Sequence, residues 1–344
     1  MVRVAVIGGG VFGCTIAADL AHAGAQVDLY EARSDILGGS TARCQARLHR
    51  GYHYPRSDST AIAARDSFNE FKHRFPLAVK QAQGHYYVIA APELDTHTSP
   101  GEYLSFCERL GLPYTVATHP MIFNADLVLR VPEAILDIDV LRRMMRRELA
   151  AEGVAVHTGT RVDQCDEFDW VVWATYGQPW GKPLRYEICE LAIVEIGRYS
   201  GESIVVMDGD FVSLDPWHGL YALYDVKHTV HASNVGTEPE IPPEYAELLR
   251  RPGLLRSELT HVDDMLESAG RFLRAVDPRG RGVSIYHGSM YSLRAVLPDV
   301  DATDERPTLI DVRGNQISVL SGKMCTAPAA ARSVVAQVFE QVTA

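Results

Sequence analysis

The sequence is poor in cysteine and has no pair of cysteines spaced for a metal or redox site. Its 344 residues include six cysteines, which are scattered without a C-x-x-C motif. This argues against a disulfide framework and against the common zinc modules. Reduced thiols in a cytoplasmic protein are the simplest expectation.

Long hydrophobic runs are also absent. No stretch approaches the roughly 20 apolar residues that cross a bilayer as a helix. The first apolar run, Val2–Ile7, leads directly into glycines, without the cationic start and the apolar segment of a signal peptide. We therefore expect neither a membrane span nor a secretory signal.

Positive charge is in short supply as well. The chain has 33 lysines and arginines against 44 aspartates and glutamates, so its formal net charge is −11. A nucleic-acid partner is not expected, because such a partner requires basic side chains that neutralise its phosphates. A single arginine can still bind a small anionic substrate, since the local field overrides the overall charge. Nothing in the sequence indicates the oligomeric state.

The N-terminal residues predict a strand, a helix and a second strand. The β-branched run Val2–Ile7 is typical of a buried strand, Val11–Ala23 of a helix that ends near Gly24, and Gln26–Glu31 of another strand. The length of the whole chain exceeds what one core comfortably holds, so one large or two intertwined domains are expected.

Helices and strands alternate in the rest of the chain. Strands are expected over 85–91, 154–157, 170–174, 188–194, 203–207, 219–231, 308–312 and 317–320, and helices over 61–74, 102–110, 139–152 and 260–274 and from about Ala327. Asp139 is expected to cap its helix, and Gly153 to end it. The Pro- and Glu-rich segment 238–252 is expected to be an exposed connection.

The residues between the first strand and the first helix carry the strongest motif. Gly8-Gly9-Gly10-Val11-Phe12-Gly13 reads G-x-G-x-x-G, in which Gly8 allows a tight turn, Gly10 lets a pyrophosphate approach, and Gly13 packs helix against strand. Glu31 ends the second strand, where a carboxylate accepts hydrogen bonds from ribose hydroxyls. A dinucleotide site is therefore predicted.

FAD, rather than NAD, is the predicted dinucleotide. The second strand is followed after a short gap by Gly38-Gly39-Ser40-Thr41, which can run beside the pyrophosphate toward a flavin. A nicotinamide domain normally continues into another ordinary helix. Cys14, beside the motif, is interpreted as a small packing residue.

From these segments onward the sequence resembles the D-amino-acid oxidase superfamily, which includes glycine oxidase, sarcosine oxidase and 2-hydroxyglutarate oxidase. Beyond the N-terminal motif, the resemblance is carried by the segments 44–54, 159–162 with 170–177, 292–295 with 298–299, and 321–323. It departs from the family at Ser292, where relatives have Gly, and at Ala295, where they have Pro.

The resemblance implies an α/β fold. A doubly wound, Rossmann-like FAD-binding domain, formed by residues 1–75, 150–185 and 300–344, is interrupted by a mainly antiparallel substrate domain, formed by 76–149 and 186–299. The implied FAD contacts are Gly8, Gly10, Val11, Phe12, Gly13, Glu31, Ala32, Arg33, Gly39, Ser40, Thr41, Arg47, Leu48, His49, Val162, Ala174, Thr175, Gly177, Arg294, Gly322, Lys323 and Met324.

Four residues are candidates for catalysis. A guanidinium grips a carboxylate with two parallel hydrogen bonds, so Arg294 is expected to hold the substrate. Lys323 is expected near the flavin edge that becomes anionic on reduction. Three roles stay open for His49: packing against the ring, acting as a base, or attaching FAD covalently. Tyr52 is expected along the flavin face, with His53 and Tyr54.

Other polar residues receive structural interpretations. His218, His228 and His231 show no metal-ligand spacing, so no metal is expected. The arginines 142, 143, 146 and 147 are expected on the wet face of an amphipathic helix.

The predicted function is FAD-dependent oxidation of a C–N bond in an amino acid or related amine that carries a carboxylate. Reduced flavin would be reoxidised by oxygen or another acceptor. The alternatives are oxidation of a 2-hydroxy acid, a redox-silent FAD-binding subunit of a larger complex, and an NAD-dependent reductase. The expected attachment of FAD is noncovalent.

Overall fold

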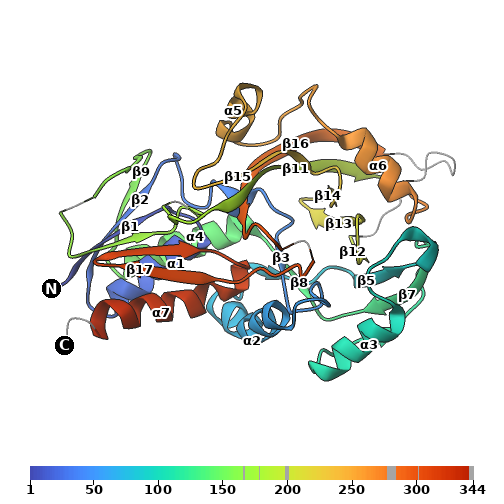
Figure 1. Cartoon of the computed structure of the whole chain (residues 1–344), viewed down its shortest axis with the longest axis horizontal. Helices are drawn as coiled ribbons and strands as arrows, with labels where there is room; N and C mark the ends of the chain where they lie inside the picture. The colour runs from blue at the N-terminus through green and yellow to red at the C-terminus, as the bar shows by residue number, and fades with distance from the viewer. Residues whose placement is uncertain (166, 178, 198–200, 277–283, 301, 341–344) are drawn as a thin grey trace.

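The protein is described here by a computed structural model covering residues 1–165, 167–177, 179–197, 201–276, 284–300 and 302–340. The last four residues of the expected segment 300–344 lie outside the described residues. Three sheets and the helices packed on them make up the fold (Figure 1).

A six-stranded sheet forms the first part of the molecule. Its strands, in spatial order, are β17 (Leu309–Arg313), β18 (Gln316–Leu320), β10 (Trp170–Trp173), β1 (Arg3–Ile7), β2 (Gln26–Glu31) and β9 (Ala155–Thr158). All neighbours pair in parallel except β17 and β18. The strand–helix–strand unit and the returning ββα unit expected from the sequence are thereby confirmed.

Helices bury the apolar residues of this sheet. Helix α1 (Val11–His22) packs against α7 (Ala327–Glu340), and both contribute to one core with β1 and β2. Strand β1 is buried from Val4 to Ile7, as a parallel strand covered on both faces requires. Residues 8–10 of the glycine motif join the end of β1 to the start of α1. The motif therefore lies at the carboxyl edge of the sheet, where open α/β sheets bind ligands.

A nine-stranded sheet forms the second part. Its strands are β5 (His85–Ala90), β6 (Thr115–Val116), β7 (Ala125–Arg130), β11 (Leu184–Ile196), β12 (Ser203–Met207), β13 (Val212–Trp217), β14 (Leu220–Asp225), β15 (Val230–Gly236) and β16 (Ser284–Val296). Only β5 and β12 pair in parallel among its described neighbours. This sheet matches the expected mainly antiparallel substrate domain.

A small three-stranded sheet lies where these two parts meet. It consists of β3 (Arg47–Leu48), β8 (Ala134–Leu136) and β4 (Val79–Lys80). The remaining helices are α2 (Asp58–Arg74), α3 (Pro100–Arg109), α4 (Ile138–Ala151), α5 (Pro243–Arg250) and α6 (Val262–Gly270), with 3-10 turns η1 (Ser40–Ala42), η2 (Pro92–Leu94) and η3 (Met324–Thr326).

The structure corrects several predicted elements. Asp137, not Asp139, caps α4, because its carboxylate accepts a hydrogen bond from the Val140 amide at 2.9 Å. The segment 238–252 contains helix α5, whose Leu249 is buried. The segment 219–231 holds parts of two strands, β14 and β15, separated by a turn. Strand β16 was not predicted at all, although it carries Arg294.

Helix α4 also bears on the domain boundaries. It lies in the range 76–149 expected for the substrate domain, yet its apolar face enters the core formed by α1, β1 and β2. Arg143, Arg146 and Arg147 are exposed on its other face, as expected for an amphipathic helix. We propose that α4 belongs with the nucleotide-binding sheet; the other boundaries stay predictions.

Candidate active site

Two of the three motif glycines have no room for a side chain. A Cβ on Gly13 would lie 1.8 Å from the Gly8 carbonyl oxygen, and one on Gly8, whose φ is +106°, would lie 2.6 Å from the Ala174 oxygen. A Cβ on Gly10 would meet only Thr41 Oγ1, at 3.6 Å. Close packing therefore fixes the turn at Gly8 and Gly13, while Gly10 leaves the approach to the helix open.

The N-terminus of α1 is free to face an anion. Its first turn has no acidic residue, and Gly10 offers no side chain as a cap. Thr41 Oγ1 accepts a 3.3 Å hydrogen bond from the Val11 amide, which brings the predicted loop to the start of the helix. A helix start of this kind binds phosphate oxygens through its unpaired N–H groups and its dipole.

The carboxylate of Glu31 is held at the end of β2. One oxygen accepts a hydrogen bond from the Gly9 amide at 2.8 Å, and the other accepts one from the Arg33 amide at 2.8 Å. These bonds place the carboxylate beside the glycine turn, as the dinucleotide motif requires.

The loop after β2 is tied to the second part of the molecule. Ser40 Oγ donates to the Leu293 oxygen on β16 at 2.8 Å. Arg43 donates to the carbonyl oxygens of Leu249 and Tyr291, both at 2.8 Å. The side chain of Arg33 also reaches Leu249 O, at 3.2 Å. The expected contacts Ala32 and Gly39 lie on this same loop.

The third expected segment flanks the glycine turn from β10. Ala174 donates its amide to the Ile7 oxygen at 2.8 Å, and Gly177, at φ +93°, accepts a hydrogen bond from the Tyr186 hydroxyl at 3.0 Å. Val162 packs against the core that contains Ile7 and Trp173. These residues and Thr175 therefore lie beside the motif.

Strand β3 and the residues after it form the centre of the site. The rings of His49 and Tyr54 lie 5.6 Å apart, and those of His49 and His53 lie 5.5 Å apart. Lys323 Nζ lies 4.8 Å from the centre of the Tyr54 ring. The structure thus brings together His49 and Lys323, which the sequence separates by most of the chain.

Burial and nearby cations determine the protonation states of His49 and Lys323 in this centre. Burial, followed by Lys323 and Arg47, lowers the pKa of His49 well below its usual value. Burial and the nearby Arg306 lower the pKa of Lys323 to about 7, against a smaller opposing effect of Asp304. His49 is therefore neutral at neutral pH, whereas Lys323 titrates there.

Several buried polar atoms of the same centre have no hydrogen-bond partner within the described residues. They include Arg47 Nε and Nη1, His49 Nδ1, His53 Nδ1 and the Tyr54 hydroxyl. Buried polar groups in native proteins are nearly always paired, so a concentration of unpaired ones indicates a place where a bound molecule supplies the partners.

Arg294 lies on β16 with two of its nitrogens already occupied. Its Nε donates to Glu187 Oε2 at 2.5 Å, and Nη1 donates to the Tyr224 hydroxyl at 2.7 Å. Glu187 comes from the neighbouring strand β11, in direct register with Arg294. These partners fix the guanidinium plane. Nη2 remains for a ligand, since the described residues give it no hydrogen bond.

The expected Gly322-Lys323-Met324 turn is also held closely. The Gly322 amide donates to Thr308 Oγ1 at 3.1 Å, and a Cβ on Gly322 would lie 2.6 Å from the Arg306 oxygen. Lys323 precedes η3, so its side chain enters the centre from the returning ββα unit.

Tyr52 is not brought to this centre in the way that was expected. Its ring is fully buried in the apolar core that contains Tyr87 and Ile89 of β5, and its hydroxyl donates to the Pro113 oxygen at 2.5 Å. The hydroxyl is therefore occupied by the backbone. Its neighbours His53 and Tyr54 do carry the unpaired atoms described above.

The sequence analysis missed the acidic partners of the site. Glu133, directly before β8, Glu187 on β11, and Asp215 on β13 are all buried. Glu133 stands in the apolar run from Val131 to Leu136, and a charge within such a run is the signal that was available.

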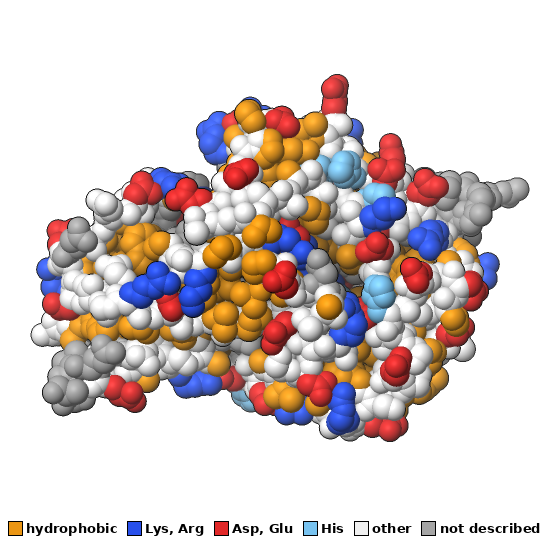
Figure 2. All heavy atoms as spheres, in the orientation of Figure 1, with side chains coloured by type: hydrophobic (Ala, Val, Ile, Leu, Met, Phe, Trp, Pro, Cys, Tyr) orange, Lys and Arg blue, Asp and Glu red, His pale blue; other side chains and the backbone are white. Residues whose placement is uncertain are grey.

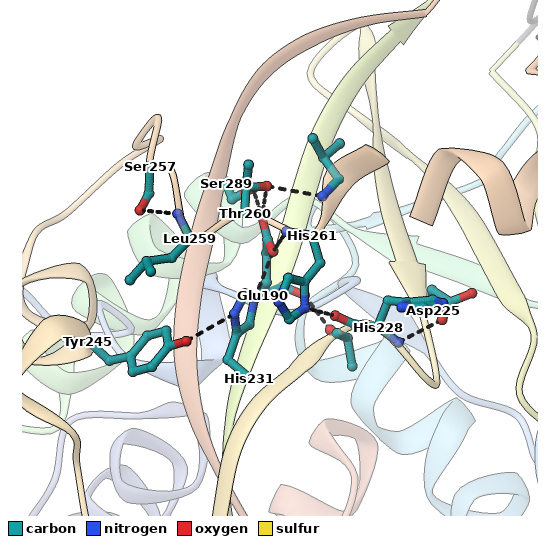
Figure 3. A network of polar contacts seen from close by, with 12 residues as sticks. Glu190, Asp225, His228, His231, Tyr245, Ser257, Leu259, Thr260, His261 and Ser289 are labelled. Carbon is teal, nitrogen blue, oxygen red and sulfur yellow. Dashed lines mark hydrogen bonds and ion pairs between the residues drawn. The ribbon is translucent and has the colours of Figure 1, made fainter. Parts of the chain in front are cut away.

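A second buried polar network lies between β11, β15 and the chain before α6 (Figure 3). Glu190 accepts hydrogen bonds from His231 Nε2 at 2.8 Å, from the His261 amide at 2.9 Å, from Thr260 Oγ1 at 2.5 Å, and from Ser289 Oγ. Burial opposes ionisation, but these donors hold the pKa of Glu190 below its usual value.

Elsewhere, the described residues show neither a metal-binding cluster nor a membrane-spanning helix. No group of three or more histidine, cysteine or acidic side chains in the described residues is arranged to hold a metal ion. No helix among them has the length and apolar character needed to cross a bilayer. On the face shown in Figure 2, acidic and basic side chains are interspersed.

Comparison with known proteins identifies a family. A family model described as FAD dependent oxidoreductase matches residues 3–332. The FAD-dependent monooxygenase FPY4 of Fusarium mangiferae is 27% identical over 349 residues, covering 93% of this chain and 87% of the relative.

Solved structures share the fold. Glycine oxidase from Geobacillus kaustophilus superimposes with a TM-score of 0.68 at 16% identity, covering 99% of this chain and 95% of its own. L-proline dehydrogenase from P. horikoshii gives a TM-score of 0.69 at 15% identity, with coverage of 99% and 94%.

Proposed function

The chain belongs to the FAD dependent oxidoreductases, and we propose that it oxidises the C–N bond of an amino acid or related amine that carries a carboxylate. The observation that carries the proposal is a cluster of cations: Lys323 and Arg47 lie close to the neutral His49, and Arg294 lies close to Lys323. Such a centre suits a substrate that is anionic at one end and gives up a proton at the other.

The residues present fit FAD. We propose that the α1 N-terminus and the loop 39–41 bind the pyrophosphate, that Glu31 binds a ribose, and that Val162 and residues 174–177 flank the adenine side. FAD, when bound, accepts two electrons and the carbon-bound hydrogen from the substrate. Gly322, Lys323, Met324, Arg47 and Leu48 would then lie beside the flavin.

Arg294 is proposed to orient the substrate. With Nε and Nη1 held by Glu187 and Tyr224, the guanidinium cannot swing, so a carboxylate on Nη2 is held in one place. A fixed carboxylate positions the neighbouring carbon for reaction, which is a large part of what an enzyme contributes. Lys323 adds positive charge below a pH of about 7.

His49 is proposed to accept the proton that the substrate nitrogen loses. The carbon-bound hydrogen leaves with two electrons, the nitrogen-bound proton passes to His49, and the C–N single bond becomes a C=N bond that water then hydrolyses. Because its pKa is lowered by burial and by two neighbouring cations, His49 is in the basic form at neutral pH.

A 2-hydroxy acid is the second candidate substrate. A hydroxyl group needs a base more than a neutral amine does, and the buried carboxylate of Glu133 lies 3.7 Å behind His49. Such a carboxylate would stabilise the imidazolium that forms when His49 takes a proton from a hydroxyl. Both candidates require Arg294, so they differ mainly in how strongly the reaction depends on His49.

The test is an anaerobic screen in which the yellow colour of the purified protein is followed. Amino acids, N-methyl amines and 2-hydroxy acids are added one at a time. We expect an amino acid or amine to bleach the flavin; bleaching by 2-hydroxy acids alone would replace the first candidate by the second.

Other outcomes would overturn the proposal. Bleaching by a nicotinamide and not by any substrate would favour the monooxygenase activity after which the Fusarium relative is named. No bleaching by any compound would favour a redox-silent subunit. A colourless protein with nicotinamide turnover would indicate a reductase.

A further inference from the structure

The carboxylate of Glu133 is fully buried, and each of its oxygens accepts one hydrogen bond. Oε1 accepts a hydrogen bond from the Arg50 amide at 2.7 Å, while Oε2 accepts one from the Tyr87 hydroxyl at 2.6 Å and lies 3.2 Å from His85 Nε2. A carboxylate has about four acceptor positions. One position on Oε1 is therefore left.

That remaining position faces His49. Glu133 Oε1 lies 3.7 Å from His49 Nδ1, and this nitrogen has no hydrogen bond within the described residues. The distance exceeds a hydrogen bond, yet catalytic hydrogen bonds are often long before ligands bind and shorten in the complex. A vacant acceptor and a donor without a partner thus stand opposite each other.

Within the described residues, no lysine or arginine forms an ion pair with Glu133, although Arg47 attracts it from farther away. His85 is neutral, because burial lowers its pKa to about 4 despite the opposing effect of Glu133. Arg47 is engaged by Asp215, with Nε 3.4 Å from Oδ2. The negative charge of Glu133 is therefore available to a proton that arrives on His49.

From this geometry we infer that Glu133 is the positioning residue that keeps the Nδ1 proton on His49 and leaves Nε2 as the basic nitrogen. An ionised carboxylate only accepts hydrogen bonds, so it selects the Nδ1–H form of the imidazole. It also stabilises the imidazolium that forms when Nε2 takes a proton, as a buried carboxylate does in other histidine pairs. The inference rests on the proposed function only in naming the substrate as the source of the proton that Nε2 accepts.

The first test needs no substrate. In FAD-loaded protein with ¹⁵N-labelled histidine, the His49 signals are assigned by their loss in His49→Asn. We expect a neutral ring protonated at Nδ1, with that proton shifted downfield by the carboxylate. In Glu133→Gln the proton signal should move upfield or exchange away, because a charge-assisted hydrogen bond has become a neutral one.

Several charged and titratable groups face His49, so the effect of Glu133→Gln on its signals must be compared with that of a matched control variant. The groups that face it are Glu133, Arg47, Lys323, His53, His85 and Tyr54. Glu187→Gln removes another buried carboxylate, the partner of Arg294, and should leave the His49 signals in place. If Glu133→Gln fails to fold, Glu133→Asp, which withdraws the carboxylate by one methylene, should move the same signals.

The second test is kinetic. Glu133→Gln should slow anaerobic bleaching by the best substrate roughly tenfold or more, since a general base contributes on the order of 10²–10⁴ in rate. In a His49→Asn background, the same substitution should cause no further loss. Unchanged His49 signals in Glu133→Gln, or equal losses in both backgrounds, would overturn the inference. A failed substrate screen would remove only the proposed function, because the spectroscopic test is independent of it.

Discussion

Two buried glutamates illustrate two different uses of a polar interior. Glu190 accepts four hydrogen bonds, and the histidines beside it are stacked with ring centres 3.9 Å apart (Figure 3). Around Glu133, by contrast, His49, His53, Tyr54 and Arg47 carry buried atoms without hydrogen bonds in the described residues.

The difference in hydrogen bonding indicates a structural role for Glu190 and a functional role for Glu133. The Glu190 network joins β11 and β15 to the chain that leads into α6, and it accounts for both carboxylate oxygens. Such a saturated network fixes a fold. The buried atoms without hydrogen bonds near Glu133 lie beside the loops that we propose to bind the flavin, where a bound molecule would supply the missing partners. Beside the Glu190 network the Tyr291 hydroxyl is also buried without a hydrogen bond in the described residues, so the contrast lies in the larger number of such atoms around His49.

The largest expected effect tests whether FAD binds beside the unsaturated centre. Gly10→Val places a branched side chain where a pyrophosphate approaches the start of α1, so the purified protein should be colourless. Absorbance at the flavin bands is the measurement. Gly101→Val, at a helical glycine with no atoms within 4 Å of its Cβ, is the control and should stay yellow. A yellow Gly10→Val protein would contradict the assignment.

The second largest effect concerns Arg294. Arg294→Ala should lower kcat/KM for a carboxylate substrate by tens to thousands of fold while FAD stays bound, because a poorly paired buried charge costs on the order of 2–5 kcal/mol. Arg294→Lys should restore only part of the activity, since an ammonium lacks the planar fork.

An uncharged analogue sharpens this prediction. Its kcat/KM should fall much less in Arg294→Ala than that of the carboxylate substrate. Equal losses for both compounds would make Arg294 a structural partner of Glu187, and the substrate-carboxylate proposal would be wrong.

A smaller effect is expected in the pH dependence at Lys323. With its pKa lowered to about 7, Lys323 is charged below neutrality and loses that charge as the pH rises. The KM for an anionic substrate should therefore increase between about pH 6 and pH 8. Lys323→Met should raise KM at pH 6 roughly tenfold, since a hydrogen bond to a charged group contributes about 1.5–3 kcal/mol.

Lys323→Arg supplies the comparison for that profile. An arginine keeps its charge over this range, so KM should stay low and flat. A wild-type KM that does not change with pH, or one that falls as the pH rises, would show that Lys323 does not bind the substrate.

Local patterns predicted the strand–helix–strand unit and its glycine turn well. Gly8 and Gly13 owe their roles to backbone contacts within one strand–helix turn, and Glu31 is placed by the length of that unit, so spacing alone reveals them. The expected ββα return was also recognisable, because its strands are joined by a short turn.

The substrate side could not be predicted in the same way. Strand β16 reads as a mixed polar sequence, and only its register with β11 brings Glu187 to Arg294. Glu133 meets His49 because β8 pairs with β3. These contacts join residues far apart in the chain, and a single sequence contains no signal for such pairing. Tyr52 was misjudged because alternation cannot say which aromatic faces the core.

The different roles of Glu133 and Glu190 are tested by one matched pair of variants, since both replace a buried glutamate by glutamine. The measurement is the rate of anaerobic flavin bleaching by the best substrate in Glu133→Gln and in Glu190→Gln. We predict a loss of roughly tenfold or more for Glu133→Gln, because it acts on a base, and a change within about threefold for Glu190→Gln, whose role is structural. Glu190→Gln should instead lower the melting temperature, since it weakens a saturated buried network by about 1–3 kcal/mol. A loss of bleaching rate in Glu190→Gln as large as in Glu133→Gln would contradict the account.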